Sequence, residues 1–123
     1  MPHRTDLAQE AWQLWKNDAG ETTELSGVRA EEHTLFGQHT TLVEILNDEG
    51  ASVLCKPIGK YATLDLDNCF TREPEAMKNI CLAAAELLRS LAGSPTDSPV
   101  LVAGLGNRNM TPDSIGPKTA DRV

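Results

Sequence analysis

Apolar residues recur at helical spacing in two parts of the chain. One stripe falls within residues 1–16 and predicts an amphipathic helix. The other begins after Pro74, a residue suited to the first turn of a helix, and is closed by Gly93. Its apolar side comprises Met77, Ile80, Cys81, Ala84, Leu87, Leu88 and Leu91.

Alternating apolar and polar positions predict two strands, residues 28–36 and 39–46. The alternation places Val43 and Ile45 on one face of the second strand. Because a glycine turn separates the two segments, we expect them to form a hairpin. Residues 47–50 read Asn-Asp-Glu-Gly and predict a turn.

A continuous apolar run follows much later, at residues 100–103, bounded by Pro99 and Gly104. Such a run is typical of a strand that is covered on both faces in a parallel sheet. Together with a further alternating strand at residues 61–66, it predicts an α/β fold with a mostly parallel central sheet flanked by helices. The hairpin is expected as an extension of this sheet. We interpret residues 1–123 as the N-terminal part of one truncated domain.

A glycine turn stands at the carboxyl end of the apolar run, where open α/β sheets place their sites. Gly104 and Gly106 make the turn, and Asn107 adds an amide that can satisfy backbone groups or face a ligand. The glycine pair could also open a dinucleotide-binding G-x-G-x-x-G motif. Asn109 occupies the third glycine position, however, so nucleotide binding is disfavoured.

The next signal is the start of a helix. Thr111 suits the N-cap and Pro112 the first helical position, which places Asp113 in the first turn. A carboxylate there would point back towards the glycine turn. From spacing alone, Asp113 either takes part in chemistry or simply complements the helix dipole, an effect of about 0.3–1 kcal/mol.

Charge and composition exclude several classes of function. The net charge of −7 opposes direct nucleic-acid binding, which needs a basic face. No apolar run approaches the length of a membrane span, and the first residues lack a signal core, so we expect a cytoplasmic location without membrane attachment. The scattered cysteines and histidines show no ligand spacing, so we expect free thiols, no metal site and no cofactor; they are Cys55, Cys69, Cys81, His3, His33 and His39.

Three segments resemble one peptidase family along nearly the whole chain. They are RTDLA at residues 4–8, KPIGKYATL at residues 56–64 and GLGNRNMTPDSIGPK at residues 104–118. The last is the most specific. The sequence is similar to the germination proteases of bacterial spores, endopeptidases that degrade small acid-soluble spore proteins.

This resemblance implies an atypical aspartic endopeptidase with a phosphorylase/hydrolase-like fold. Asp113 matches one of two essential aspartates, and the second is expected downstream of Val123, so residues 1–123 alone should be inactive. The family is made as a self-processing zymogen that cleaves between an acidic and an aliphatic residue. The matching bond here is Asp6–Leu7, with residues 1–6 as the propeptide. A homotetramer in the forespore and spore core is also implied.

Four further residues are candidates for binding. The backbone amides around Gly106 and Asn107 are candidates for stabilising a tetrahedral oxyanion. Lys56 and Lys60 are candidates for neutralising an acidic substrate side chain, although loop lysines are more commonly just solvated. A substrate cleaved after acidic residues would need such cationic partners.

Two alternatives stay open. The turn also resembles hydrogenase-maturation endopeptidases, in which an acidic residue corresponding to Asp113 binds nickel and a later glycine corresponds to Gly116. That resemblance covers only the turn. The other alternative is a folded, non-catalytic interaction fragment.

Overall fold

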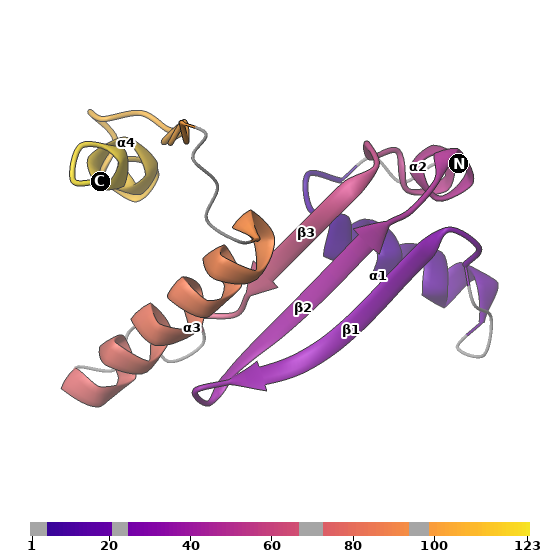
Figure 1. The fold of residues 1–123 in the computed structure, drawn as a ribbon, viewed down its shortest axis with the longest axis horizontal. Coiled ribbons are helices and arrows are strands. Elements are labelled where there is room, and N and C mark those ends of the chain that lie inside the picture. The colour runs from indigo at the N-terminus through magenta and orange to yellow at the C-terminus, as the bar shows by residue number, and fades with distance from the viewer. Residues whose placement is uncertain (1–4, 21–24, 67–72, 94–98) are drawn as a thin grey trace.

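The computed structural model describes residues 5–20, 25–66, 73–93 and 99–123. His3, Cys69 and residues 1–4 of the predicted propeptide lie outside these ranges. The chain forms, in order, α1 (Ala8–Ala19), β1 (Val28–Leu35), β2 (Gln38–Ile45), α2 (Asp48–Leu54), β3 (Gly59–Leu64), α3 (Pro74–Ala92), the 3-10 turn η1 (Thr111–Asp113) and α4 (Ile115–Ala120) (Figure 1).

The described strands form one antiparallel sheet in the order β1-β2-β3, so the predicted mostly parallel sheet is wrong. The predicted hairpin is confirmed, but it forms most of the sheet rather than an extension. Phe36 and Gly37 make its turn with φ of 50° and 79°. Such a two-residue turn can only join antiparallel neighbours, whereas a parallel connection needs a long crossover.

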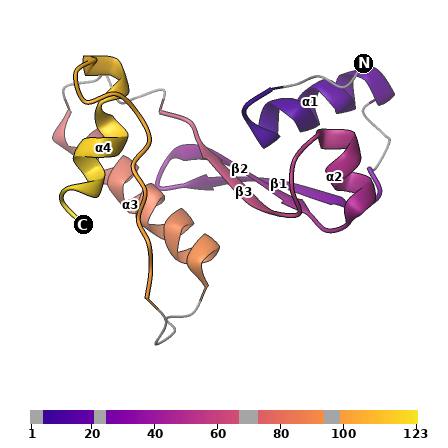
Figure 2. The same ribbon diagram turned by 90° about the horizontal axis from the view of Figure 1, so that it is seen from above.

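One face of this sheet carries the principal core. Val43 and Ile45 are each 1% exposed and pack with the buried Leu54 and with two alanines of α1, Ala8 and Ala11. The predicted inward face of β2 is therefore confirmed. The first helix is also confirmed, although it starts at Ala8 and ends at Ala19. Figure 2 shows α1 and α2 together at one end of the sheet.

The predicted turn at residues 47–50 is wrong, because α2 begins there. Asn47 is the N-cap, and its side chain accepts a 3.0 Å hydrogen bond from the Gly50 N–H. Asp48 and Glu49 then lie in the first turn, where negative charge complements the helix dipole. The residue types that favour a turn also favour the start of a helix, since both depend on a short side chain satisfying nearby backbone N–H groups.

The long second helix is confirmed as α3, with Pro74 in its first turn and Gly93 as its C-cap. It packs on β3 and β2. Its predicted apolar side is only partly covered: Ile80 is buried, whereas Met77 and Leu88 are 52% and 67% exposed. Within the described ranges, no helix has both the length and the apolar character needed to cross a membrane.

The predicted buried strand at residues 100–103 is also wrong. The segment has no assigned strand structure, and Val100 and Leu101 are 85% and 91% exposed. A strand is defined by its hydrogen-bonded neighbours, and residues 99–103 make no backbone pairing with any described segment. The chain instead runs from α3 to η1 and α4, which lie apart from α1 and α2 in both views (Figures 1 and 2).

Candidate active site at the glycine turn

Two backbone segments approach each other closely around Asp113, and glycine makes this possible on both sides. A Cβ built on Gly106 would lie 2.0 Å from the Asp113 carbonyl oxygen, and one on Gly104 would lie 2.0 Å from the Gly116 oxygen. A Cβ on Gly116 would meet the Leu105 oxygen at 2.1 Å. Every one of these distances is far too short for a side chain. The sequence motif therefore encodes a backbone-to-backbone contact between residues 104–106 and 113–116.

The Asp113 carboxylate is held by the same turn. The Asn107 N–H donates to Asp113 Oδ2 at 2.9 Å and to the Asp113 carbonyl oxygen at 3.0 Å. Asp113 is nevertheless exposed. One carboxylate oxygen is thus fixed relative to the turn, while the group as a whole stays open to solvent and to an incoming molecule.

The local helix differs from the prediction. Met110, not Thr111, is the N-cap of η1, and no side chain caps it. Asp113 closes η1, two residues before α4 begins at Ile115. The buried Ser114 lies between the two elements, and its hydroxyl donates to the Thr111 carbonyl at 3.0 Å. The carboxylate therefore precedes the α4 N-terminus instead of lying inside the first turn of an α-helix.

Asn107 forms its hydrogen bonds with other residues of the same turn. Its side-chain Oδ1 accepts from the Asn109 N–H at 3.0 Å, and its carbonyl accepts from the Met110 N–H at 3.1 Å. Because its own N–H donates to Asp113, that amide is not free to stabilise an oxyanion in this arrangement. Among the described residues, the Gly106 N–H has no hydrogen-bond acceptor. Gly106 thus stays the better candidate of the two.

An ion pair that no sequence pattern indicates fixes the other side of the turn. Arg108 forms a two-pronged pair with Asp121, with Nη2 2.7 Å from Oδ1 and Nη1 on Oδ2. These hydrogen bonds, with the guanidinium charge, lower the pKa of Asp121 below its ordinary 3.8. The pair joins residues 107–110 to the end of α4. Thirteen positions separate the partners, so no local sequence pattern points to it.

We predict that Arg108→Gln raises the pKa of Asp121 towards 3.8, because the hydrogen bonds and the positive charge that favour the carboxylate are removed. A carboxyl NMR titration measures this directly. Arg122→Gln is the matched control, since that arginine has no ion pair within the described ranges. The pKa of the Asp121 carboxyl is lower in the folded protein than in the unfolded chain, so the ion pair stabilises the turn at pH values above the unfolded-state pKa. This stabilisation is lost as the pH falls through the folded-state pKa of Asp121. An equal shift in both variants would contradict the assignment.

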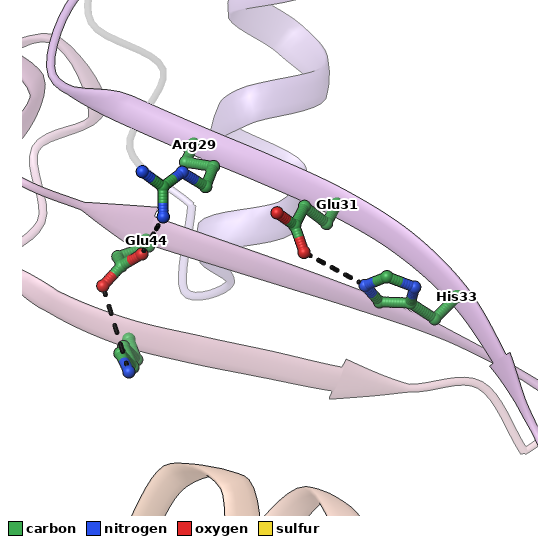
Figure 3. Close-up of polar contacts among 5 residues, drawn as sticks. Arg29, Glu31, His33 and Glu44 are labelled. Carbon is green, nitrogen blue, oxygen red and sulfur yellow. Dashed lines mark hydrogen bonds and ion pairs between the residues drawn. The ribbon is translucent and has the colours of Figure 1, made fainter.

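The two candidate lysines each contact a partner within the chain, and the two partners, Thr5 and Glu44, belong to different elements. The Lys60 Nζ lies 4.0 Å from Glu44 Oε1, and the same carboxylate accepts from Arg29 at 3.3 Å. Figure 3 shows Arg29 and Glu44 pointing towards one another across β1 and β2. The Lys56 Nζ donates to the backbone carbonyl of Thr5. In this chain neither ammonium is directed at Asp113.

The predicted processing bond directly precedes α1, a helix that lies apart from η1 and α4 in both views (Figures 1 and 2). Asp6 is exposed, and Leu7, 47% exposed, is the N-cap of α1. Asp113 and the Asp6–Leu7 bond are therefore not brought together within one copy of the chain as folded here. Within the described ranges, no three His, Cys, Asp or Glu side chains gather as a metal site would require.

Comparisons with known proteins agree on one family. A family model described as germination protease matches residues 5–123. A germination protease of Clostridium perfringens is 39% identical over 121 residues, which is 98% of this chain and 37% of that protein. Those of Caldanaerobacter subterraneus and Priestia megaterium are 36% and 33% identical, each over 98% of this chain and over 36% and 34% of their own length. The chain thus spans little more than a third of these relatives. No solved structure matches it.

Proposed function

The chain belongs to the germination protease family, and on that premise we propose that the protein is an atypical aspartic endopeptidase that degrades small acid-soluble spore proteins. The observation that carries the proposal is the match across residues 5–123, which includes the turn that presents Asp113. An exposed carboxylate with one oxygen fixed by a backbone N–H suits such a role. The proposed location is the cytoplasm of the forespore and the spore core.

In the proposed mechanism, Asp113 is one of two carboxylates. One accepts a proton from water as the water oxygen attacks the peptide carbonyl carbon, and the other donates a proton to the leaving nitrogen as the C–N bond breaks. Two close carboxylates can share the required proton, because like charges oppose full ionisation of the pair. The second carboxylate is proposed to come from the part of the family sequence that this chain does not cover. Residues 1–123 alone are then inactive.

Three further features are proposed on the family resemblance. The protein is made as a zymogen and removes residues 1–6 by cutting between Asp6 and Leu7. It cleaves substrates after acidic residues and before aliphatic ones. It assembles as a homotetramer. The exposed side chains of Asp6 and Leu7 support the first of these, because a processing bond has to be reached by a peptidase.

Cleavage specificity tests the proposal. Peptides with a Glu–Ile or Asp–Leu bond are incubated with the protein expressed from its whole reading frame, and the products are identified by mass. We expect cutting after the acidic residue. Cutting should be at least tenfold slower when Gln or Asn replaces that residue, because a tenfold ratio corresponds to the loss of only about 1.4 kcal/mol of interaction with the substrate's negative charge. Equal rates for acid and amide would contradict the proposed specificity. Loss of activity with a chelator, restored by nickel, would favour the hydrogenase-maturation alternative.

A further inference from the structure

The KPIGK segment has no role in the chemistry proposed above, yet the structure gives its first lysine a definite partner. The Lys56 Nζ donates to the Thr5 carbonyl oxygen, 51 positions earlier in the sequence. Lys56 is half-buried, and its own N–H donates to the Ala51 carbonyl at 3.2 Å at the end of α2. The lysine is thus anchored to the folded body by its backbone, and its side chain reaches the residue just before Asp6.

The backbone carbonyl of Leu7, on the other side of Asp6, is held as well. The Leu7 carbonyl accepts from the Ala11 N–H at 3.1 Å, the first hydrogen bond of α1, and from the Thr5 hydroxyl at 2.8 Å. Ala8 and Ala11 are each 4% exposed in the core. The start of α1 therefore cannot unwind without disturbing buried packing. Asp6 and the bond that follows it lie between two fixed carbonyls.

Cleavage of a bond in this setting requires local opening. A peptidase binds several residues on either side of the bond in an extended form, so the segment has to leave the folded body first. Opening the amino-terminal side of the Asp6–Leu7 bond breaks the Lys56 contact. A hydrogen bond from a charged donor is stronger than a neutral one, and the half-burial of Lys56 reduces competition from water.

We propose that Lys56 is a positioning residue for the Asp6–Leu7 bond. It latches the residue before Asp6 to the body of the protein and so limits how often the bond becomes available for cleavage. The consequence for zymogen processing rests on the proposed function. The latch itself is a property of this chain and is measurable without any activity of the protein.

Lys60 supplies a matched control. It belongs to the same KPIGK segment and carries the same charge, but its Nζ faces Glu44 of β2 at 4.0 Å and not the N-terminal segment. Lys60→Met therefore removes one ammonium from the segment and leaves the Thr5 contact in place. Lys56→Arg keeps a charged donor at the latch, whereas Lys56→Met removes it.

The experiment uses the protein expressed from its whole reading frame with Asp113→Asn, so that self-processing does not compete. A glutamyl endopeptidase, under buffer conditions in which it also cuts after aspartate, is added at low ratio, and the initial rate of loss of residues 1–6 is followed by intact mass. Hydrogen exchange of the peptide that contains residues 5–11 is measured in parallel. We expect Lys56→Met to raise both rates about tenfold, the ratio that loss of one charge-assisted hydrogen bond gives. Lys56→Arg should restore most of the protection, and Lys60→Met should match the parent.

Two outcomes would overturn the latch. One is a Lys56→Met rate within twofold of the parent, and the other is equal acceleration in Lys60→Met, which would indicate general loosening of the segment. The proposed function fails separately. If the protein with Asp113 intact never removes residues 1–6, the zymogen proposal is wrong, although the effect of Lys56→Met on the added protease would still stand.

Discussion

Asp113→Asn should reduce peptide cleavage by the protein expressed from its whole reading frame by at least about 10²-fold, the lower range for loss of a positioned acid or base. The amide has nearly the same size as the carboxylate but cannot accept a proton from water. Its oxygen can still accept from the Asn107 N–H, a contact of 2.9 Å in the native turn. The turn should therefore survive while the chemistry is lost. Initial rates on an acidic–aliphatic peptide measure the loss, and the thermal unfolding midpoint shows whether the fold is retained.

Asp48→Asn is the control for this variant. Asp48 is another exposed carboxylate near the start of a helix, in the first turn of α2, and no chemistry is assigned to it. We expect cleavage to stay within about twofold of the parent, since loss of a helix-dipole contact costs only about 0.3–1 kcal/mol of stability. An Asp113→Asn protein that keeps most of its activity would contradict the role of Asp113 as half of the dyad.

Gly106→Ala should have the second-largest effect. Its φ of 143° is a backbone conformation that L residues rarely adopt, and the added Cβ would lie 2.0 Å from the Asp113 carbonyl oxygen. The contacting atom belongs to the backbone, so residues 104–106 and η1 have to move apart. A displacement of about 1 Å at a reacting group can cost 10²-fold in rate. We therefore expect a loss of activity approaching that of Asp113→Asn, together with about 1–3 kcal/mol lower stability.

Gly37→Ala is the control for this variant, because it introduces backbone strain without a close contact. Gly37 also has a positive φ, 79°, but a Cβ there would meet nothing within 4 Å. Its replacement should cost about 1–2 kcal/mol from the left-handed conformation alone and leave the cleavage rate unchanged. Activity and unfolding midpoint are measured on both variants. Equal cleavage rates in Gly106→Ala and the parent would show that the close approach of the two segments does not position Asp113.

The hairpin and the inward face of β2 could be predicted because both are local. The alternation in residues 39–46 decides which side chains face the core, and the short turn at Phe36 and Gly37 decides the pairing. Whether residues 100–103 join a parallel sheet cannot be predicted from local sequence. The apolar character of residues 100–103 predicts a strand, but strand formation depends on a neighbour that local sequence does not specify.

The same difference between local and long-range features holds for the residues proposed to act in the site. One short motif indicates Asp113, Gly106 and Asn107, and the structure joins all three in one turn. The contact of Lys56 with Thr5 joins residues distant in sequence and depends on how the folded segments meet. Neither periodicity nor spacing carries such information. The sequence predicts the glycines as turn residues, whereas the structure requires them because a second backbone segment approaches too closely for a side chain.

The most direct test of Asp113 as half of a self-processing aspartic dyad is the intact mass of the protein expressed from its whole reading frame, with Asp113→Asn in parallel. We predict that the unaltered protein loses residues 1–6 over time, leaving a chain that begins at Leu7, and that the Asp113→Asn protein keeps them. Loss of the segment from both proteins, or from neither, would contradict the assignment.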